Sequence, residues 1–207
     1  MTAGTTRVEL TTGREALVRV PQGDETGHPS AMVLLLHGAG GDARAGLGLL
    51  EEHADDAGLL LVAPSSLAAT WDGVLGRVGS DGDAIDALMD EVVSRHSVDP
   101  AAVAVAGFSD GASYALGLAL GDGDRFRHVV AFSPGFVAGD TRHGRPRVLV
   151  SHGRGDRVLP IDRCGRPVAR RMAEQGYDVT FLEFDGGHTV PDPIRQAAVR
   201  WLLGREG

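Results

Sequence analysis

Short, unbroken apolar runs recur along this chain, and stretches with helical spacing separate them. The runs cover residues 31–36, 59–63, 101–108, 129–132 and 147–151. An apolar run of this length is typical of a strand buried on both faces, as in parallel sheets. Residues 178–184 add a further expected strand. The alternation predicts an α/β fold with a mostly parallel central sheet and helices on both faces.

Helical periodicity marks the segments between these runs. We expect helices over residues 47–57, 83–96, 110–120, 163–175 and 191–203. In the second of these, five apolar side chains recur on what should be the inner face: Ile85, Leu88, Met89, Val92 and Val93. Gly176 follows the fourth helix as a stop signal, and early prolines suit the first turn of the fifth.

Polar turns divide the N-terminal part. Residues 6–10 and 15–20 flank a short turn that contains glycine, which predicts an antiparallel N-terminal hairpin at one edge of the sheet. Residues 22–30 are polar and we expect a loop there. The length of 207 residues suits a single α/β domain over residues 1–207. No long insertion interrupts the pattern, so we expect no cap domain and an open site.

A serine with a glycine two residues before it and another two residues after it lies where the expected 101–108 strand meets the expected 110–120 helix. Residues 107–111 read GFSDG and match the G-x-S-x-G nucleophile elbow, which presents a serine hydroxyl above the sheet edge. The following helix directs its N–H groups and positive dipole end toward the same point. Glycine is common in this chain, so an ordinary glycine-rich turn with a capping serine is the alternative. Ser113, one turn along, is expected to be a packing residue.

Composition limits the chemistry available around that serine. The chain has no lysine, which excludes Schiff-base chemistry and a Walker lysine. Its net charge of -8 makes it a poor candidate for binding nucleic acid. One cysteine, Cys164, cannot form a disulfide within the chain, and we expect it to be a structural thiol. We see no secretory signal or apolar run of membrane-spanning length, and expect a soluble, cytoplasmic protein with no membrane span.

A nucleophilic serine needs a base and an acid that orients it. The loops after the 147–151 and 178–184 strands supply Asp156 and His188, in the Ser–acid–His order of α/β-hydrolases. Ligands of open α/β sheets bind beyond these strand ends. Asp156 would hold the imidazole of His188, which would accept the Ser109 proton. His152 as the base and Asp185 as the acid remain alternatives.

The 31–36 strand runs into a glycine-rich turn, residues 36–41, that reads LHGAGG. A tetrahedral oxyanion needs preorganised N–H donors, and small residues let the backbone approach the substrate. We expect the oxyanion hole to consist of the N–H groups of Ala39 and Asp110, with His37 bracing the loop. The Asp110 carboxylate would oppose an anionic transition state, so we expect it to point away.

Taken together, these segments resemble the α/β-hydrolase serine esterases of the phospholipase/carboxylesterase and acyl-protein thioesterase group. The matching stretches are LLLHGAGGD, AGFSDGASYALGLAL, FSPGF, SHGRGDRVLPIDR and GYDVTFLEFDGGHTVP. The resemblance implies a capless hydrolase that uses no cofactor and no metal, with Ser109, Asp156 and His188 as its triad. It is shared in part with feruloyl esterases and polyhydroxybutyrate depolymerases. Asp110 departs from the commoner forms, in which an uncharged residue follows the serine.

The sequence thus predicts a carboxylesterase that cleaves small-molecule esters of short to medium acyl chain through an acyl-enzyme on Ser109. Trp71, Phe136 and Leu159 follow strand ends near the expected site, and each is a candidate for substrate binding or for core packing. Thioesterase or lysophospholipase activity is one alternative. A non-catalytic protein of hydrolase fold that binds a ligand is another.

Overall fold

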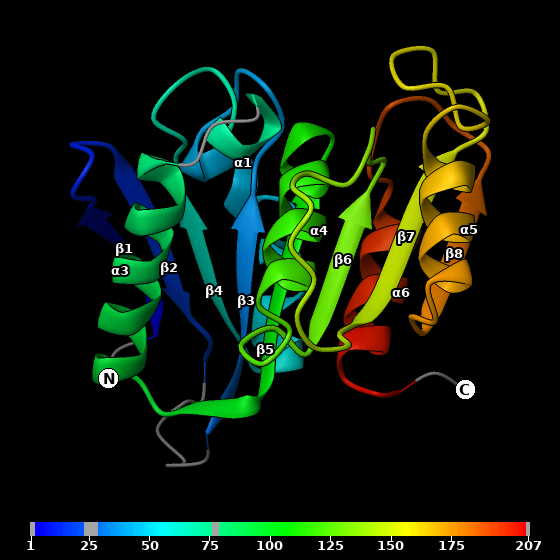
Figure 1. The fold of residues 1–207 in the computed structure, drawn as a ribbon. Coiled ribbons are helices and arrows are strands. Elements are labelled where there is room, and N and C mark those ends of the chain that lie inside the picture. The colour runs from blue at the N-terminus through cyan, green and yellow to red at the C-terminus, as the bar shows by residue number, and fades with distance from the viewer. Residues whose placement is uncertain (1–2, 23–28, 76–78, 206–207) are drawn as a thin grey trace.

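The computed structural model describes residues 3–22, 29–75 and 79–205. Its centre is a twisted eight-stranded sheet with the strand order β1-β2-β4-β3-β5-β6-β7-β8 (Figure 1). The first two strands are antiparallel to their neighbours, and the pairs from β4–β3 to β7–β8 are parallel. The strands are β1 (Gly4–Glu9), β2 (Glu15–Val20), β3 (Ser30–Leu36), β4 (Leu59–Pro64), β5 (Val98–Phe108), β6 (His128–Phe132), β7 (Arg147–Gly153) and β8 (Val179–Phe184).

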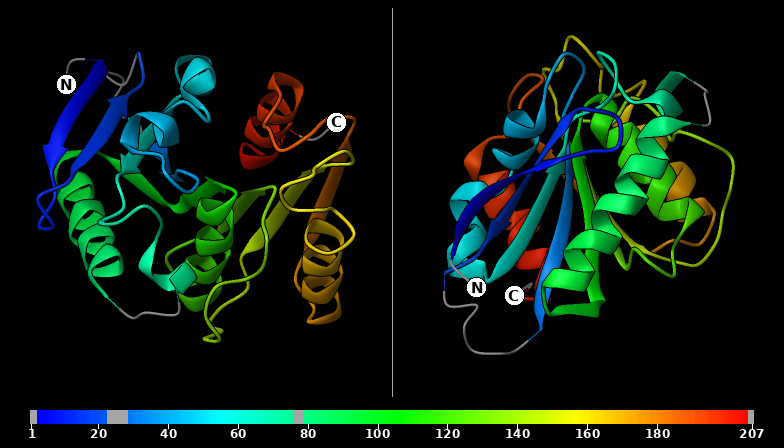
Figure 2. Two further views of the ribbon diagram at one scale, coloured as in Figure 1. Left: turned by 90° about the horizontal axis from the view of Figure 1, so that it is seen from above. Right: turned by 90° about the vertical axis from the view of Figure 1, so that its left-hand side faces the viewer.

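Helices cover both faces of this sheet, as the view from above shows (Figure 2). One face carries α3 (Ser80–Arg95), α4 (Asp110–Gly121) and α5 (Gly165–Glu174). The other carries α1 (Ala43–Leu47), α2 (Ala54–Ala57) and α6 (Asp192–Leu202). Two short 3-10 turns, η2 (Glu51–His53) and η3 (Asp72–Leu75), complete the elements. The α/β-hydrolase fold expected from the sequence is confirmed, and the described residues include no separate cap domain.

Two apolar cores sit on either side of the sheet because successive strand residues point to opposite faces. Along β3, Leu34 and Leu36 face the core under α3, α4 and α5. Val33 and Leu35 face the core under α1, α2 and α6. A strand buried on both faces must be apolar at every position, which is why β3 and β4 read as unbroken apolar runs.

The prediction of a single helix over residues 47–57 is wrong. The Asp42 carboxylate accepts the Ala45 N–H at 2.9 Å, so the helix begins earlier, at Ala43. It packs against β3 through Gly46, where a Cβ would lie 2.8 Å from the Leu35 carbonyl oxygen. The helix then ends at Gly48, and the chain resumes helical structure only at η2 and α2.

Three smaller outcomes concern element edges. The N-terminal hairpin is confirmed, with β1 beginning at Gly4 instead of residue 6. Val93 was expected on the inner face of α3, but it is 51% exposed, so the buried stripe of α3 ends at Val92. The loop expected over residues 22–30 falls mostly on residues 23–28, which lie outside the described residues. Among the described residues, no helix is long and apolar enough to cross a membrane.

Candidate active site

The elbow at the end of β5 holds Ser109 in a backbone conformation that side-chain-bearing residues seldom adopt. Its φ is 56° and its ψ is -118°, in a region where strain is kept only if the surroundings enforce it. A Cβ on Gly107 would lie 2.3 Å from the Gly111 carbonyl oxygen. A Cβ on Gly111 would lie 2.3 Å from the carbonyl oxygen of Leu36. A side chain at either position would clash with the backbone, so both residues must be glycine. The strained turn that they allow carries Ser109.

Ser109, His188 and Asp156 form one continuous hydrogen-bonded chain, although they are far apart in sequence. The Ser109 hydroxyl lies 2.9 Å from His188 Nε2. His188 Nδ1 lies 2.6 Å from Asp156 Oδ2 on the other side of the ring. Because an ionised carboxylate only accepts, Nδ1 carries the proton, which leaves Nε2 free to accept the serine proton. This arrangement is the geometry of an activated nucleophile.

The loop after β7 holds the Asp156 carboxyl group in a fixed, fully buried position. Its Oδ1 accepts the N–H groups of Val158 and Leu159, both at 2.9 Å, while Oδ2 serves His188. Burial works to raise the pKa of this group. The hydrogen bonds from Leu159 and His188 outweigh burial and hold the pKa of Asp156 below its ordinary value. The carboxylate therefore stays ionised at neutral pH and can stabilise a protonated imidazole.

Neither alternative from the sequence lies in position to replace these groups. His152 Nε2 donates to the Leu159 carbonyl oxygen at 2.7 Å, and the ring is fully buried. It packs so closely on the next helix that a Cβ at Gly165 would lie 2.4 Å from its Nδ1. Asp185 is 90% exposed at its side chain and pairs with Arg154 at 2.9 Å. His152 thus supports the loop that carries Asp156, and Asp185 belongs to the surface.

The turn after β3 passes directly beside the nucleophile. A Cβ on Gly38 would lie 3.4 Å from the Cβ of Ser109, and Ala39 follows as an exposed residue. His37 stands beneath this turn: its Nδ1 donates to the Gly38 carbonyl oxygen at 2.8 Å, and its Nε2 accepts the Ser66 N–H at 3.0 Å. Burial lowers the pKa of His37, so the ring is neutral and can make both bonds.

The side chain of Asp110 is hydrogen-bonded to Thr70, next to Ala69, whose carbonyl oxygen accepts the Gly40 N–H of the turn after β3. The Asp110 Oδ2 accepts the hydroxyl proton of Thr70 at 2.8 Å. That its carboxylate points away from Ser109 stays a prediction. The backbone of Asp110 opens α4, where the first N–H groups of a helix have no partner within the helix.

Comparison with known proteins adds a reaction class to this geometry. The family model named Esterase matches residues 84–158, which include Ser109 and Asp156. Feruloyl esterase C of Emericella nidulans is 28% identical over 218 residues, covering 89% of this chain and 79% of the relative. Probable feruloyl esterase C of Aspergillus niger is 30% identical over 210 residues, covering 85% of this chain and 76% of the relative. This chain belongs to the α/β-hydrolase serine esterases.

A solved structure agrees on the fold of the esterase. The S-formylglutathione hydrolase of Staphylococcus aureus superposes with a TM-score of 0.79, at 19% identity, over 98% of this chain and 96% of that chain. The family resemblance expected from the sequence is confirmed, and so is the general activity. The esterase hydrolyses carboxylic esters, which are small-molecule substrates, as a serine hydrolase.

The sequence left two roles open for Trp71, substrate contact and core packing, and its burial in the esterase favours core packing. Its side chain is only 1% exposed and stacks on Tyr114 at a ring distance of 5.5 Å. Its indole N–H donates to the His37 carbonyl oxygen at 2.9 Å. Trp71 therefore braces the turn after β3 from below and has no surface left for a substrate. The sequence could not separate these roles, because both need a large apolar ring beyond a strand end.

Leu159 donates its N–H to Asp156, and Phe136 follows Gly135, which lies against the Leu159 side chain. The Phe136 side chain is 44% exposed, and Leu159 is partly buried. The chain at Gly135 and Phe136 is held to α4, because both residues direct their N–H groups at the Ser113 hydroxyl, at 3.1 and 3.4 Å. Ser113 is thus a packing residue, as expected, and both apolar side chains stay available to a substrate.

A supporting segment that the sequence did not reveal runs from Ser65 to Asp72. The hydroxyl of Ser65 accepts the Ala43 N–H at 2.9 Å, which ties this segment to the start of α1. At the other end, the buried Asp81 carboxylate accepts the N–H groups of Leu67 and Asp72, at 2.7 and 2.9 Å. In the sequence, the Ser-Ser pair just after the β4 strand was the feature that could have indicated this segment.

Cys164 is buried, and burial raises the pKa of its thiol, which suits the expected structural role.

Proposed function

We propose that this esterase cleaves carboxylic esters of short to medium acyl chain by way of an acyl-enzyme on Ser109. The observation that carries the proposal is the hydrogen-bonded chain from the Ser109 hydroxyl through His188 to Asp156. The three groups come from the ends of β5, β8 and β7, at the edge where α/β sheets place their ligands.

The reaction would proceed in two halves. Ser109 Oγ attacks the ester carbonyl carbon while His188 Nε2 takes its proton, and the protonated ring then gives that proton to the departing alcohol. Water attacks the acyl-enzyme in the second half, with His188 again as the base, and the acid leaves Ser109. Asp156 keeps the ring oriented and stabilises its positive charge in both halves.

The N–H groups of Ala39 and Asp110 are the proposed oxyanion donors. Each such donor is typically worth about 2.7–4 kcal/mol of transition-state stabilisation. Support comes from Gly38 beside Ser109 and from the His37 and Trp71 bonds that fix the turn. A turn held by buried donors needs little reorganisation when charge develops, and preorganisation of this kind is where such a site gains its rate.

The remaining assignments rest on the sequence. We propose that residues 1–207 act as one hydrolase domain in the cytoplasm and do not bind nucleic acid. The net charge of -8 and the absence of lysine argue against binding to a phosphate backbone. Thioesters and lysophospholipids react through the same oxyanion intermediate, so they belong in the substrate panel beside simple esters.

The test is hydrolysis of p-nitrophenyl acetate and butyrate by wild type and Ser109→Ala. We expect turnover by wild type and loss of about 10⁶ in kcat in the variant, the usual cost of removing a triad serine. His188→Ala should behave in the same way, whereas Ser113→Ala should keep its turnover. A folded wild type without turnover, or a Ser109→Ala variant that keeps its rate, would favour the non-catalytic binding protein instead.

A further inference from the structure

A groove runs down the face of the molecule between residues 135–142 and α5. Its volume is about 250 Å³. The floor is apolar and includes Leu120, Val168 and Met172. From residue 163 to residue 175 the lining follows the start and the length of α5, about 18 Å at the rise of a helix. The groove is therefore long and narrow.

The upper end of this groove lies next to residues that pack against the segments carrying Ser109 and Asp156. Gly135 and Phe136 line the groove, and both direct their N–H groups at the Ser113 hydroxyl. That hydroxyl in turn lies 3.3 Å from the carbonyl oxygen of Ser109. A Cβ on Gly135 would lie 3.5 Å from the side chain of Leu159, whose N–H binds Asp156. This is therefore the end at which an acyl chain on Ser109 would have to enter the groove.

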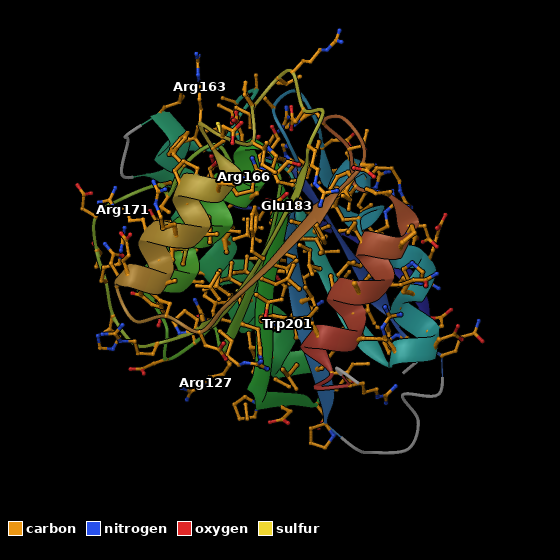
Figure 3. The ribbon with its side chains drawn as sticks, turned by 90° about the vertical axis from the view of Figure 1, so that its right-hand side faces the viewer. Arg127, Arg163, Arg166, Arg171, Glu183 and Trp201 are labelled. Atoms are coloured by element: carbon orange, nitrogen blue, oxygen red, sulfur yellow. The ribbon has the colours of Figure 1, made fainter. Side chains whose placement is uncertain are left out.

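Arginine side chains surround the groove without carboxylate partners. Arg142, Arg163 and Arg171 all line it, and none of them forms an ion pair with another described residue. Arg166, on the same helix, shows the contrast: it points toward β8 and binds Glu183 at 2.8 Å (Figure 3). Arg163 and Arg171 lie away from that pair, with Arg171 on the opposite side of α5 (Figure 3).

The charge of the groove is opposite to that of the chain. The whole sequence carries -8, yet the groove has three arginines against one carboxylate, Asp140. An arginine guanidinium binds a carboxylate through two parallel hydrogen bonds, which makes it selective for that group. An apolar floor with a few convergent polar groups is the usual make-up of a ligand site. The volume suits one part of a substrate, since whole drug-sized ligands occupy about 300–1,000 Å³.

We propose that this groove is an acyl subsite for esters whose acyl chain ends in a free carboxylate, such as monoesters of dicarboxylic acids. The apolar floor takes the methylene chain, and the arginines take the terminal carboxylate. The inference rests on the proposed function, because it assumes that Ser109 holds the acyl group. It adds the substrate class: acidic monoesters above neutral esters of the same length.

The experiment compares the mono-p-nitrophenyl ester of dodecanedioic acid with its methyl-capped, neutral counterpart. We expect wild type to favour the acidic ester in kcat/KM by about tenfold or more. The double variant Arg163→Gln, Arg171→Gln should lose this preference, mainly through a higher KM for the acidic ester. The change should be larger for the acidic ester than for the neutral one, because only the acidic ester has a carboxylate for the arginines to bind. Salt should lower the preference of wild type, because these side chains are exposed to solvent.

Arg127→Gln is the matched control. Arg127 is also exposed and outside any ion pair among the described residues, but it lies at the opposite end of the sheet (Figure 3). It should keep the preference of wild type. Equal rates for the two esters, or a preference that survives the double substitution, would overturn the subsite.

Failure of the proposed function gives a different result, because wild type would then hydrolyse neither ester. Binding of the monomethyl ester of dodecanedioic acid to Ser109→Ala, measured by calorimetry, tests the groove without any turnover. We expect binding that weakens about tenfold in the double arginine background. Binding that is absent, or equal in both backgrounds, would count against the subsite whatever the kinetics.

Discussion

Trp71 shows how one buried side chain can control a reaction that it does not touch. Its indole N–H reaches the His37 carbonyl oxygen at the base of the turn beside Ser109. We predict that Trp71→Phe lowers kcat about three- to tenfold with little change in KM, because a loosened turn misplaces an N–H that acts only on the transition state. The measurement is steady-state hydrolysis of p-nitrophenyl acetate together with a urea unfolding curve.

Trp201→Phe is the control for the loss of an indole hydrogen bond as such. The Trp201 N–H donates to the Thr180 hydroxyl at 3.0 Å, well away from the turn after β3. Each variant should lose about 1 kcal/mol of unfolding free energy, the usual contribution of one hydrogen bond. Only Trp71→Phe should lose turnover; equal kinetic losses in both would mean that Trp71 acts on global stability alone.

Helix α4 must approach β3 more closely than any side chain would permit. A Cβ on Gly111 would meet two backbone oxygens, those of Leu36 and His37, at 2.3 and 2.4 Å. Gly111→Ala should therefore lower the unfolding free energy by about 2 kcal/mol or more, and should cut activity by moving the start of α4. Gly121→Ala, at the other end of the same helix, meets nothing closer than 4.0 Å. It should be neutral or stabilising by up to about 1 kcal/mol. The measurement is urea unfolding of both variants. Equal stability of the two would show that the close contact at Gly111 does not require a glycine.

The same elements show what the sequence could and could not predict. Unbroken apolar runs located β3 and β4, because burial on both faces leaves no polar positions. The 47–57 helix was misplaced, because Leu49 and Leu50 are buried in the turn between helices and imitate a helical stripe. Asp42 would have corrected it, since an aspartate three residues before a free N–H is a helix-capping signal. The role of Trp71 depends on its contact with His37, 34 residues away in the sequence, and no local sequence pattern predicts such a contact.

On the scale of the whole molecule, the sheet ends in two exposed edge strands, and β8 protects its edge with charge. Edge strands invite pairing with other chains, and charged side chains on them counter this. Glu183 on β8 accepts from Arg166 Nε and Nη2, both at 2.8 Å, and from Arg154 at 3.0 Å. The sequence did not predict the order of the eight strands, because an apolar run indicates a strand but not which strands pair with it. The pairing of β8 with β7 is what brings Glu183 to Arg154.

This network predicts a specific dependence of stability on pH. Its hydrogen bonds, those from Arg166 first, lower the pKa of Glu183 to about 2 from an ordinary value of 4.5. The stabilisation is thus complete above pH 4.5 and is lost as the pH falls toward 2, because the unfolded chain takes up the proton first. Glu183→Gln should be less stable than wild type at pH 7, and the difference should shrink at pH 3 and in high salt. Glu174→Gln is the control, because its partner Arg170 is 3.9 Å away and both side chains are exposed. Unfolding curves at the two pH values that gave a constant difference for Glu183→Gln would show that its ion pairs add nothing to stability.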